Sequence, residues 1–318
     1  MINKYKLLYL KSFPFDSENY FDKIIAPLDP EQTFYAIEND EVVSGCYLRN
    51  FDFFASGKVR EISVLGGVCT AVEKRGKGLA GIAISKALNF MFDKGQPFCF
   101  LHPVNYKYYK RFGFIGIERA DDVMLCGTED CKVAELSKIN ASEIVDFIAK
   151  TNQNRNFYVL CHTYYIERCF DETQACGGNI YKLSSQDMTA YVFITGNSID
   201  YAFTDNAEKL KRIGFLNGLK FTDYNGTNPD YTQGRITNVI KTISLINPIK
   251  PFDFTVKIID SIISGNNLCV RVVSDGKNIK TQMVNNAKYE ISVDELFSKI
   301  IFGTQYNAPI NPSIRNKY

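Results

Sequence analysis

A short basic loop that contains two glycines is the segment whose residue types and spacing point most directly to chemistry. It joins the end of a β-rich segment to the start of a helical one, through Val68, Cys69, Thr70, Arg75, Gly76, Lys77, Gly78, Leu79 and Ala80. In such a turn several backbone N–H groups converge at the positive end of the helix, and glycine lets the backbone approach an anion closely. Arg75 and Lys77 add positive charge to the helix dipole. The loop therefore predicts a site for the pyrophosphate of a nucleotide-type cofactor.

The loop resembles motif A of the GCN5-related N-acetyltransferases (GNAT). The family pattern R-x-x-G-x-G/A is met by Arg75, Gly78 and Ala80, and the later run from Tyr108 to Phe114 resembles the family's terminal Y-x-x-x-G-F element. The P-loop pattern GxxxxGK[ST] is absent from the sequence. The resemblance implies acetyl-CoA (CoA) as the cofactor, with its pyrophosphate on the loop. Its pantetheine arm would pair with free backbone groups of Val68, Cys69 and Thr70.

Acyl transfer from a thioester to an amine requires a neutral amine and a proton for the departing thiolate. A lysine-like amine with a pKa near 10.4 is less than about 0.1% neutral at pH 7, so a general base or a desolvating acidic pocket is needed. The acid must still be protonated at neutral pH, and a tyrosine with a pKa of about 10 meets that condition. The resemblance assigns this role to Tyr109, which lies at the family position three residues before Phe112.

The base is assigned by a closer resemblance to the Eis-like (enhanced intracellular survival) acetyltransferases. That family has two GNAT domains, of which only the first has an intact cofactor motif, followed by a sterol-carrier-like domain. Its C-terminal carboxylate enters the first site as the base, a role that would fall here to Tyr318. Glu61 is the rival, because it lies on the strand that enters the motif, at a position that resembles the base of other family members, and His102 is a third candidate.

The elements that must position these residues follow from hydrophobic periodicity. Three strand segments between Thr33 and Val72 predict an antiparallel meander, and apolar residues at helical spacing from Leu79 to Phe90 predict a helix that ends at Gly95. The runs 190–195 and 199–204 predict a hairpin. Residues 135–170 and 207–219 have helical patterns. Residues 223–233 are predicted to form a linker. After it, the sequence predicts a helix at 235–245, three further strands and a final helix.

These patterns and the resemblance together predict an α/β (α+β) protein of three domains. We expect a catalytic GNAT domain at 1–126, a degenerate second GNAT domain at 127–228 in which R-x-x-G-x-A is missing, and a sterol-carrier-like α+β domain with a C-terminal tail at 229–318. A length of 318 residues suits several domains.

Composition excludes several other classes of protein. The formal net charge of +2, without runs of like charge, disfavours a nucleic-acid or membrane partner, and no apolar stretch is long enough to span a bilayer. Nine scattered cysteines and two histidines fit neither a disulfide framework nor a metal site, so we expect free thiols, no metal and a cytoplasmic location.

The predicted function is acetyl-CoA-dependent N-acetyltransfer to a primary amine by direct attack in a ternary complex. The acceptor would be a polyamine, an aminoglycoside-like compound or a lysine amine, and the resemblance also suggests a homo-oligomer. The alternative is a non-catalytic protein that binds acyl-CoA or lipid. A third class, the aminoacyl transferases that pair two such domains, is disfavoured because the intact motif lies in the first domain.

Overall fold

The computed structural model describes residues 1–303 except 15, 56, 154–156, 225, 229–230 and 249, and it leaves the side chains of residues 157 and 301–303 undescribed. The chain divides into two compact units. The described residues of the first unit lie within 1–12, 29–118 and 231–303, and those of the second lie within 13–28 and 119–228. The three-domain division at 126 and 228 stays a prediction.

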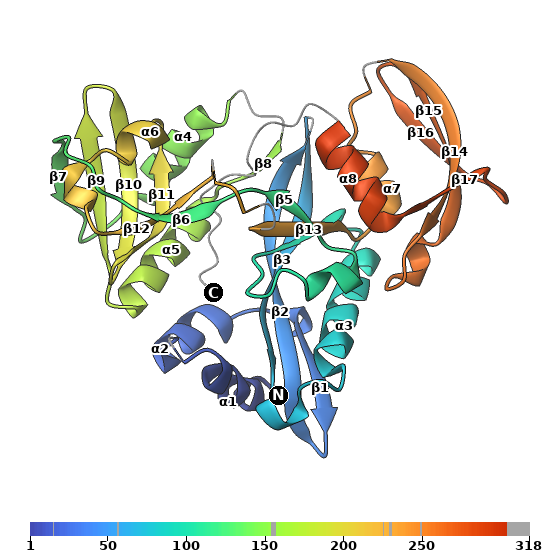
Figure 1. Ribbon diagram of the computed structural model, residues 1–318, viewed down its shortest axis with the longest axis horizontal. Coiled ribbons are helices and arrows are strands. Elements are labelled where there is room, and N and C mark those ends of the chain that lie inside the picture. Colours follow the sequence, from blue (N-terminus) through green and yellow to red (C-terminus); the bar gives the residue numbers. More distant parts are fainter. Residues whose placement is uncertain are drawn as a thin grey trace. The chain divides into compact units, whose positions relative to one another are not determined.

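The sheet of the first unit begins with the meander that the sequence predicts. After helix α1 (Ile2–Ser12) and the short helix η2 (Pro30–Gln32), strands β1 (Thr33–Glu38), β2 (Glu41–Ala55) and β3 (Lys58–Thr70) pair antiparallel in chain order (Figure 1). Asn39 and Asp40 both have positive φ, at 49° and 63°, which is the backbone of a tight hairpin turn. The predicted meander is confirmed.

Helix α3 (Leu79–Asp93) packs against this sheet, as its periodicity predicts (Figure 1). The short helix η3 (Val72–Lys74) lies between β3 and α3. One face of α3 contributes Ala83, Ile84, Ala87, Leu88 and Met91 to the main core cluster. The sheet contributes Cys46, Leu48, Leu65, Cys99 and Leu101 to the same cluster. Burial of these aliphatic side chains fixes α3, and with it the loop that precedes α3, against β2 and β3.

The other edge of this sheet differs from the sequence prediction. Strand β13 (Thr232–Ile236) lies between β4 (Phe98–Leu101) and β5 (Ile115–Glu118), so the strand order is β1-β2-β3-β4-β13-β5. The prediction of a linker up to residue 233 followed by a helix from 235 is therefore wrong over β13. Helix forms only in α7 (Val239–Ile243), after the N-cap Asn238.

The rest of the first unit is a four-stranded sheet with a terminal helix (Figure 1). Its strand order is β16-β15-β14-β17, and its elements are β14 (Pro251–Ile259), η6 (Ser264–Asn266), β15 (Leu268–Asp275), β16 (Ile279–Met283), β17 (Tyr289–Ser292) and α8 (Val293–Gly303). Helix α8 contacts both β17 and β13. The sequence predicts three strands and a final helix here, and the structure adds β17 to them.

The second unit is built on a sheet of order β6-β12-β11-β10-β9-β7. Its elements are α2 (Glu18–Tyr20), η1 (Phe21–Ile25), β6 (Asp121–Met124), β7 (Lys132–Glu135), α4 (Ala141–Thr151), β8 (Phe157–Val159), α5 (Thr163–Ala175), β9 (Asn179–Ser185), β10 (Met188–Thr195), β11 (Ser198–Thr204), α6 (Ala207–Leu210), η5 (Gly214–Leu216) and β12 (Lys220–Asp223). The predicted hairpin is confirmed as β10 and β11. Helix covers only parts of 135–170 and 207–219, because β8 and loops interrupt the first range and turns interrupt the second.

Candidate active site

Strands β3 and β4 separate before β3 ends, which leaves one edge of β3 open. The two strands pair in parallel only where Ser63 and Val64 face Cys99 and Phe100. From Gly66 to Thr70, β3 continues against β2 alone in the described part of the chain. Unpaired strand edges present backbone N–H and C=O groups to an extended, amide-containing partner. Val68, Cys69 and Thr70, which the resemblance assigns to the pantetheine arm, lie on this stretch, and their backbone groups alternate between the β2 edge and the open edge.

A β-bulge sits at the start of the open stretch. Gly45 faces Cys69 while Tyr47 faces Gly66, so β3 carries one extra residue against β2, and Gly67 has a φ of +61°. There is no room for a side chain on either glycine. A Cβ on Gly66 would lie 2.5 Å from the Tyr47 ring, and one on Gly67 would lie 2.4 Å from the Tyr5 hydroxyl oxygen.

Sequence reasoning missed this bulge, although two adjacent glycines inside a strand are a recognised signal for one. The Tyr5 hydroxyl donates a hydrogen bond to the Gly67 carbonyl at 2.7 Å, and the ring of Tyr47 is fully buried. Two buried aromatic side chains therefore close the back of the bulge.

The predicted anion loop has the opposite character. Gly76 and Gly78 both have a φ of +78°, and a Cβ on either would meet nothing within 4 Å. Gly78 is the N-cap of α3 and offers no side-chain cap, so the first N–H groups of the helix, from Leu79 and Ala80 onward, are available to a ligand. Gly76, Gly78 and Gly81 also have the spacing G-x-G-x-x-G, but here it follows an antiparallel meander rather than opening a βαβ unit.

The basic residues of the loop are exposed. Arg75 donates from Nε to the Thr70 carbonyl at 3.3 Å, and Lys74 pairs with Glu38 at 2.6 Å. Among the described residues neither Arg75 nor Lys77 forms an ion pair with an acidic side chain. An uncapped helix start, two glycines in open space and two cations fit the pyrophosphate of an acyl-CoA.

Tyr109 is the first residue of the one-turn helix η4 (Tyr109–Phe112). Its ring packs edge-on against Tyr108 and Phe114, at centroid distances of 5.1 and 6.0 Å, and lies against the core cluster that contains Cys46. Burial raises the pKa of Tyr109 well above its usual value, and Tyr108, Cys46 and Cys69 raise it further. Within the described residues its hydroxyl has no hydrogen-bond partner. Tyr109 is thus protonated at neutral pH and lies near β2 and β3.

The three base candidates have different surroundings. The Glu61 carboxylate is exposed on β3 and accepts a hydrogen bond from Gln96 Nε2 at 2.6 Å. Five residues of extended strand, about 16 Å, separate Glu61 from the bulge at Gly66. His102 Nδ1 lies 3.2 Å from the Thr232 hydroxyl, which itself donates to Glu118 at 2.6 Å. Tyr318 lies outside the described residues.

The described residues contain no group of three or more His, Cys, Asp or Glu side chains placed to hold a metal ion. No helix among them has the length and apolar character that a membrane span requires. All nine cysteines are free thiols.

Known proteins share this fold. Residues 5–116 match the family model described as an acetyltransferase (GNAT) domain. A probable N-acyltransferase from Enterococcus faecalis V583 has a TM-score of 0.70 and 14% identity, over 92% of this chain and 85% of its own. A GCN5-related N-acetyltransferase from Anabaena variabilis ATCC 29413 has a TM-score of 0.70 and 13% identity, over 94% and 87%. Eis1 from Mycobacterium abscessus has a TM-score of 0.65 and 12% identity, over 95% and 87%. No curated protein sequence matches the chain.

The chain therefore carries an acetyltransferase domain of the GNAT fold at residues 5–116. The prediction that the protein is an acetyltransferase is confirmed, and so is the mixed α/β fold class. Acyl-CoA is the donor that GNAT acetyltransferases use, and the open edge of β3 with the Arg75–Ala80 loop fits such a molecule.

Proposed function

We propose that the protein transfers an acetyl group from acetyl-CoA to a primary amine, with the thioester held at the bulge of β3. The observation that carries this proposal is that one segment contains both an open strand edge at Gly66–Thr70 and an uncapped helix start at Gly78. The first offers backbone partners to an amide-rich arm, and the second offers N–H groups to a pyrophosphate.

The acyl group is proposed to be short because the bulge is closed from behind. Tyr5 and Tyr47 fill the space that a side chain on Gly66 or Gly67 would need. The space behind the bulge is filled by these rings and leaves no volume for a long acyl chain on that side, since protein interiors are packed as densely as organic crystals. Acetyl fits this space better than a fatty acyl group.

The reaction balances as a direct attack in a ternary complex. The neutral amine nitrogen bonds to the thioester carbonyl carbon, the C–S bond breaks, and the amine gives up a proton. Tyr109 supplies a proton to the departing thiolate, since its raised pKa keeps it protonated. The products are the N-acetyl amine and CoA with a free thiol.

Two carboxylates are proposed as the base that takes the amine proton, and Glu61, which about 16 Å of strand separates from the bulge, would take it through a chain of water molecules. Glu61 is held by Gln96, and the C-terminal carboxylate of Tyr318 is assigned by the Eis-like resemblance. The acceptor is proposed to be a polyamine, an aminoglycoside-like compound or a lysine amine. The degenerate second GNAT domain, the sterol-carrier-like C-terminal domain, a homo-oligomer and a cytoplasmic location remain proposals of the same resemblance.

One observation favours the alternative of a lipid-binding protein. Phe254, Met283 and Tyr289 are more than 45% exposed on the four-stranded sheet, and their register places them on the same face as Val256 and Val270. A protein that only binds acyl chains would use such a face and would release no thiol from acetyl-CoA.

The deciding experiment measures free thiol from acetyl-CoA, butyryl-CoA and myristoyl-CoA with spermidine, kanamycin and a lysine peptide. We expect amine-dependent thiol release from acetyl-CoA, and a loss of about 100-fold in kcat for Tyr109→Phe with unchanged KM for acetyl-CoA. Tyr108→Phe is the matched control and should retain activity. Thiol release with none of these amines, together with binding of myristoyl-CoA, would establish the lipid-binding alternative instead.

The same assay separates the two bases. Glu61→Gln and removal of Tyr318 each test one carboxylate, and Glu73→Gln, on an exposed residue of η3, is the control. The variant that loses the base should recover part of its rate at higher pH, where more of the amine is neutral.

A further inference from the structure

A fully buried arginine joins three parts of the first unit. Arg235 on β13 has a side-chain exposure of 0%, and its Nη2 pairs with Asp260 Oδ2 at 2.5 Å. Its Nε donates to the Ile236 carbonyl at 2.9 Å, and its Nη1 donates to the Phe112 carbonyl. Each of the three guanidinium nitrogens thus has a partner, which meets the high desolvation cost of a buried charge.

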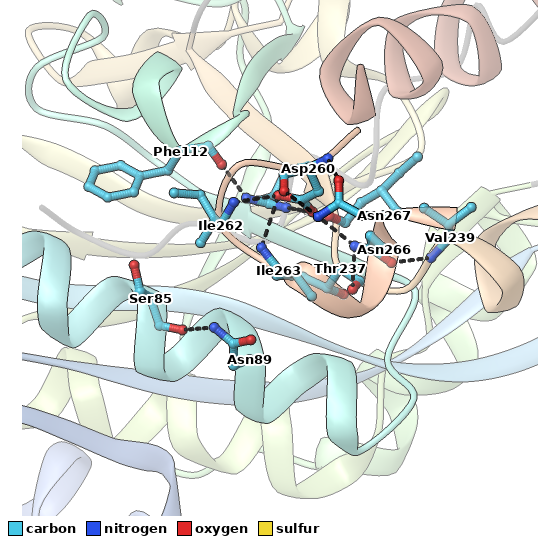
Figure 2. A network of polar contacts seen from close by, with 12 residues as sticks. Ser85, Asn89, Phe112, Thr237, Val239, Asp260, Ile262, Ile263, Asn266 and Asn267 are labelled. Carbon is cyan, nitrogen blue, oxygen red and sulfur yellow. Dashed lines mark hydrogen bonds and ion pairs between the residues drawn. The ribbon is translucent and has the colours of Figure 1, made fainter. Parts of the chain in front are cut away.

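Asp260 is itself held by the loop that follows β14 (Figure 2). Its Oδ1 accepts from the backbone N–H groups of Ile262 and Ile263, at 2.9 and 3.1 Å, and its Oδ2 accepts from Asn266 Nδ2 at 2.9 Å. Asn266 also donates to the Thr237 carbonyl at 3.1 Å. Because Ile263 belongs to the core cluster beneath α3, the carboxylate has a fixed position.

The partner of Arg235 on the other side is the helix that carries Tyr109. Phe112 ends η4, and the carbonyls at the end of a helix have no partner within it. Figure 2 shows the Phe112 carbonyl directed toward the network while its ring points away. The next residue, Gly113, has a φ of +78°, and a Cβ there would lie 3.5 Å from Arg235 Nη1. Arg235 therefore caps η4, with its positive charge at the negative end of the helix dipole.

We propose that Arg235 and Asp260 are positioning residues for Tyr109. The ion pair fixes the C-terminal end of η4, and η4 is one turn long, so its first residue cannot move independently of its last. Neither residue contacts the reacting atoms in this proposal. The inference rests on the proposed function, in which Tyr109 protonates the leaving thiolate.

The test is Arg235→Lys in the full-length protein, assayed with acetyl-CoA and the fastest amine of the panel. A lysine ammonium can keep the charge beside Asp260 but lacks the planar fork that reaches Ile236 and Phe112 together. We expect kcat to fall about 10-fold or more and KM for acetyl-CoA to change less than about threefold. Arg271→Lys is the matched control, because Arg271 pairs with Asp253 at 2.5 Å in the same unit while both side chains are 47% exposed. It should leave both constants unchanged.

The dependence of kcat on pH distinguishes a positioning role from a purely stabilising one. An ion pair that only stabilises the fold would leave the pH at which kcat falls on the alkaline side unchanged. The titratable side chains that act on Tyr109 are those of Tyr108, the N-cap of η4, Cys46 of β2 and Cys69 of β3, and all three remain in the variant. In the wild type we expect the alkaline limb to lie well above about pH 10, because burial raises the pKa of Tyr109. A released η4 would let water reach Tyr109, its pKa would fall toward the ordinary tyrosine value of about 10, and the limb would move to lower pH in Arg235→Lys.

A second variant covers the case in which Arg235→Lys does not fold. Arg235→Met combined with Asp260→Asn removes both charges, so no uncompensated buried charge remains, and it lacks the cap on Phe112. It should show the same fall in kcat and the same alkaline shift. A wild-type kcat or an unmoved alkaline limb in the folded variant would overturn the positioning role. A Tyr109→Phe variant with full activity would instead overturn the acid role proposed for Tyr109 itself.

Discussion

Two glycine pairs lie ten residues apart along one strand–loop–helix segment, and they are glycine for opposite reasons. Gly66 and Gly67 have no space for a Cβ, because Tyr47 and Tyr5 occupy it. Gly76 and Gly78 have empty space around them, and their positive φ values leave backbone N–H groups uncovered. We call Gly66–Gly67 the closed end of the segment, because tyrosine rings fill the space beside it, and Gly76–Gly78 the open end, because the space beside it is empty. The difference shows that glycine can be required at one position by crowded surroundings and at another by a left-handed backbone in open space.

The largest expected effect comes from filling the closed pair. Gly66→Val would place a branched side chain 2.5 Å from the Tyr47 ring, and overpacking of this kind costs about 3 kcal/mol of unfolding free energy. Urea denaturation followed by circular dichroism measures the loss.

The matched control is Gly81→Ala within α3, where a Cβ would lie 3.5 Å from the Phe112 ring. Because that distance is an ordinary contact and alanine favours helix, the control should gain up to about 1 kcal/mol. If Gly66→Val is as stable as the wild type, the bulge is not closed by Tyr47.

Filling the open pair should affect binding more than stability. Gly78→Ala puts a methyl group beside the first N–H groups of α3, so we expect the Kd for CoA, measured by calorimetry, to rise about 30-fold, or about 2 kcal/mol. Gly196→Ala is the control, because Gly196 also has positive φ, at +56°, with nothing within 4 Å of a Cβ. It carries the same backbone strain and should leave CoA affinity unchanged. Equal effects in the two variants would mean that strain, rather than a lost anion site, is responsible.

Shortening Tyr47 at the closed end should make the protein less selective for acetyl-CoA over longer acyl-CoA donors. In Tyr47→Leu we expect the ratio of kcat/KM for butyryl-CoA to that for acetyl-CoA to rise about 10-fold, because small changes in an apolar pocket discriminate by that order. Tyr9→Leu, which also shortens a buried tyrosine, is the control and should keep the wild-type ratio. An unchanged ratio in Tyr47→Leu would place the acyl group elsewhere.

The effect that is smallest at neutral pH concerns the Cys69 thiol of β3. Burial raises the pKa of the Cys69 thiol to about 12, from an ordinary value near 9. A raised pKa in the folded state stabilises the protein fully below pH 9, and that stability is lost as pH rises toward 12. Cys69→Ala should therefore flatten the alkaline fall in unfolding free energy by about 1 kcal/mol per pH unit. The exposed Cys126→Ala should leave the slope as in the wild type, and an equal slope in both variants would contradict the burial of Cys69.

The open end of this segment could be predicted from sequence, and the closed end could not. The spacing of Arg75, Gly78 and Ala80 is local, and the apolar period of α3 identifies the helix that it opens. The role of Gly66 and Gly67 depends on Tyr5 and Tyr47, which come from other elements, so no local pattern shows whether their surroundings are full or empty.

Strand β13 could not be predicted from the sequence either, because its partners also lie far away in the chain. All five of its residues are buried, but Gln233 and Arg235 interrupt any apolar alternation. A buried arginine is explained only by its partner Asp260, which belongs to the loop after another strand. Its neighbours in the sheet, β4 and β5, lie more than one hundred residues earlier in the chain. Pairing at that distance leaves no trace in periodicity.

The position of β13 also determines when this domain can fold. Until residues 232–236 have left the ribosome, β4 and β5 lack the strand that joins them and expose two unpaired edges, which are sites of aggregation. Pairs so distant in sequence also form slowly, because the entropy of closing a long loop is lost before the stabilising contacts form. The acetyltransferase sheet is therefore completed late in synthesis, and a nascent chain that stops before β13 has a cofactor loop but an unfinished sheet.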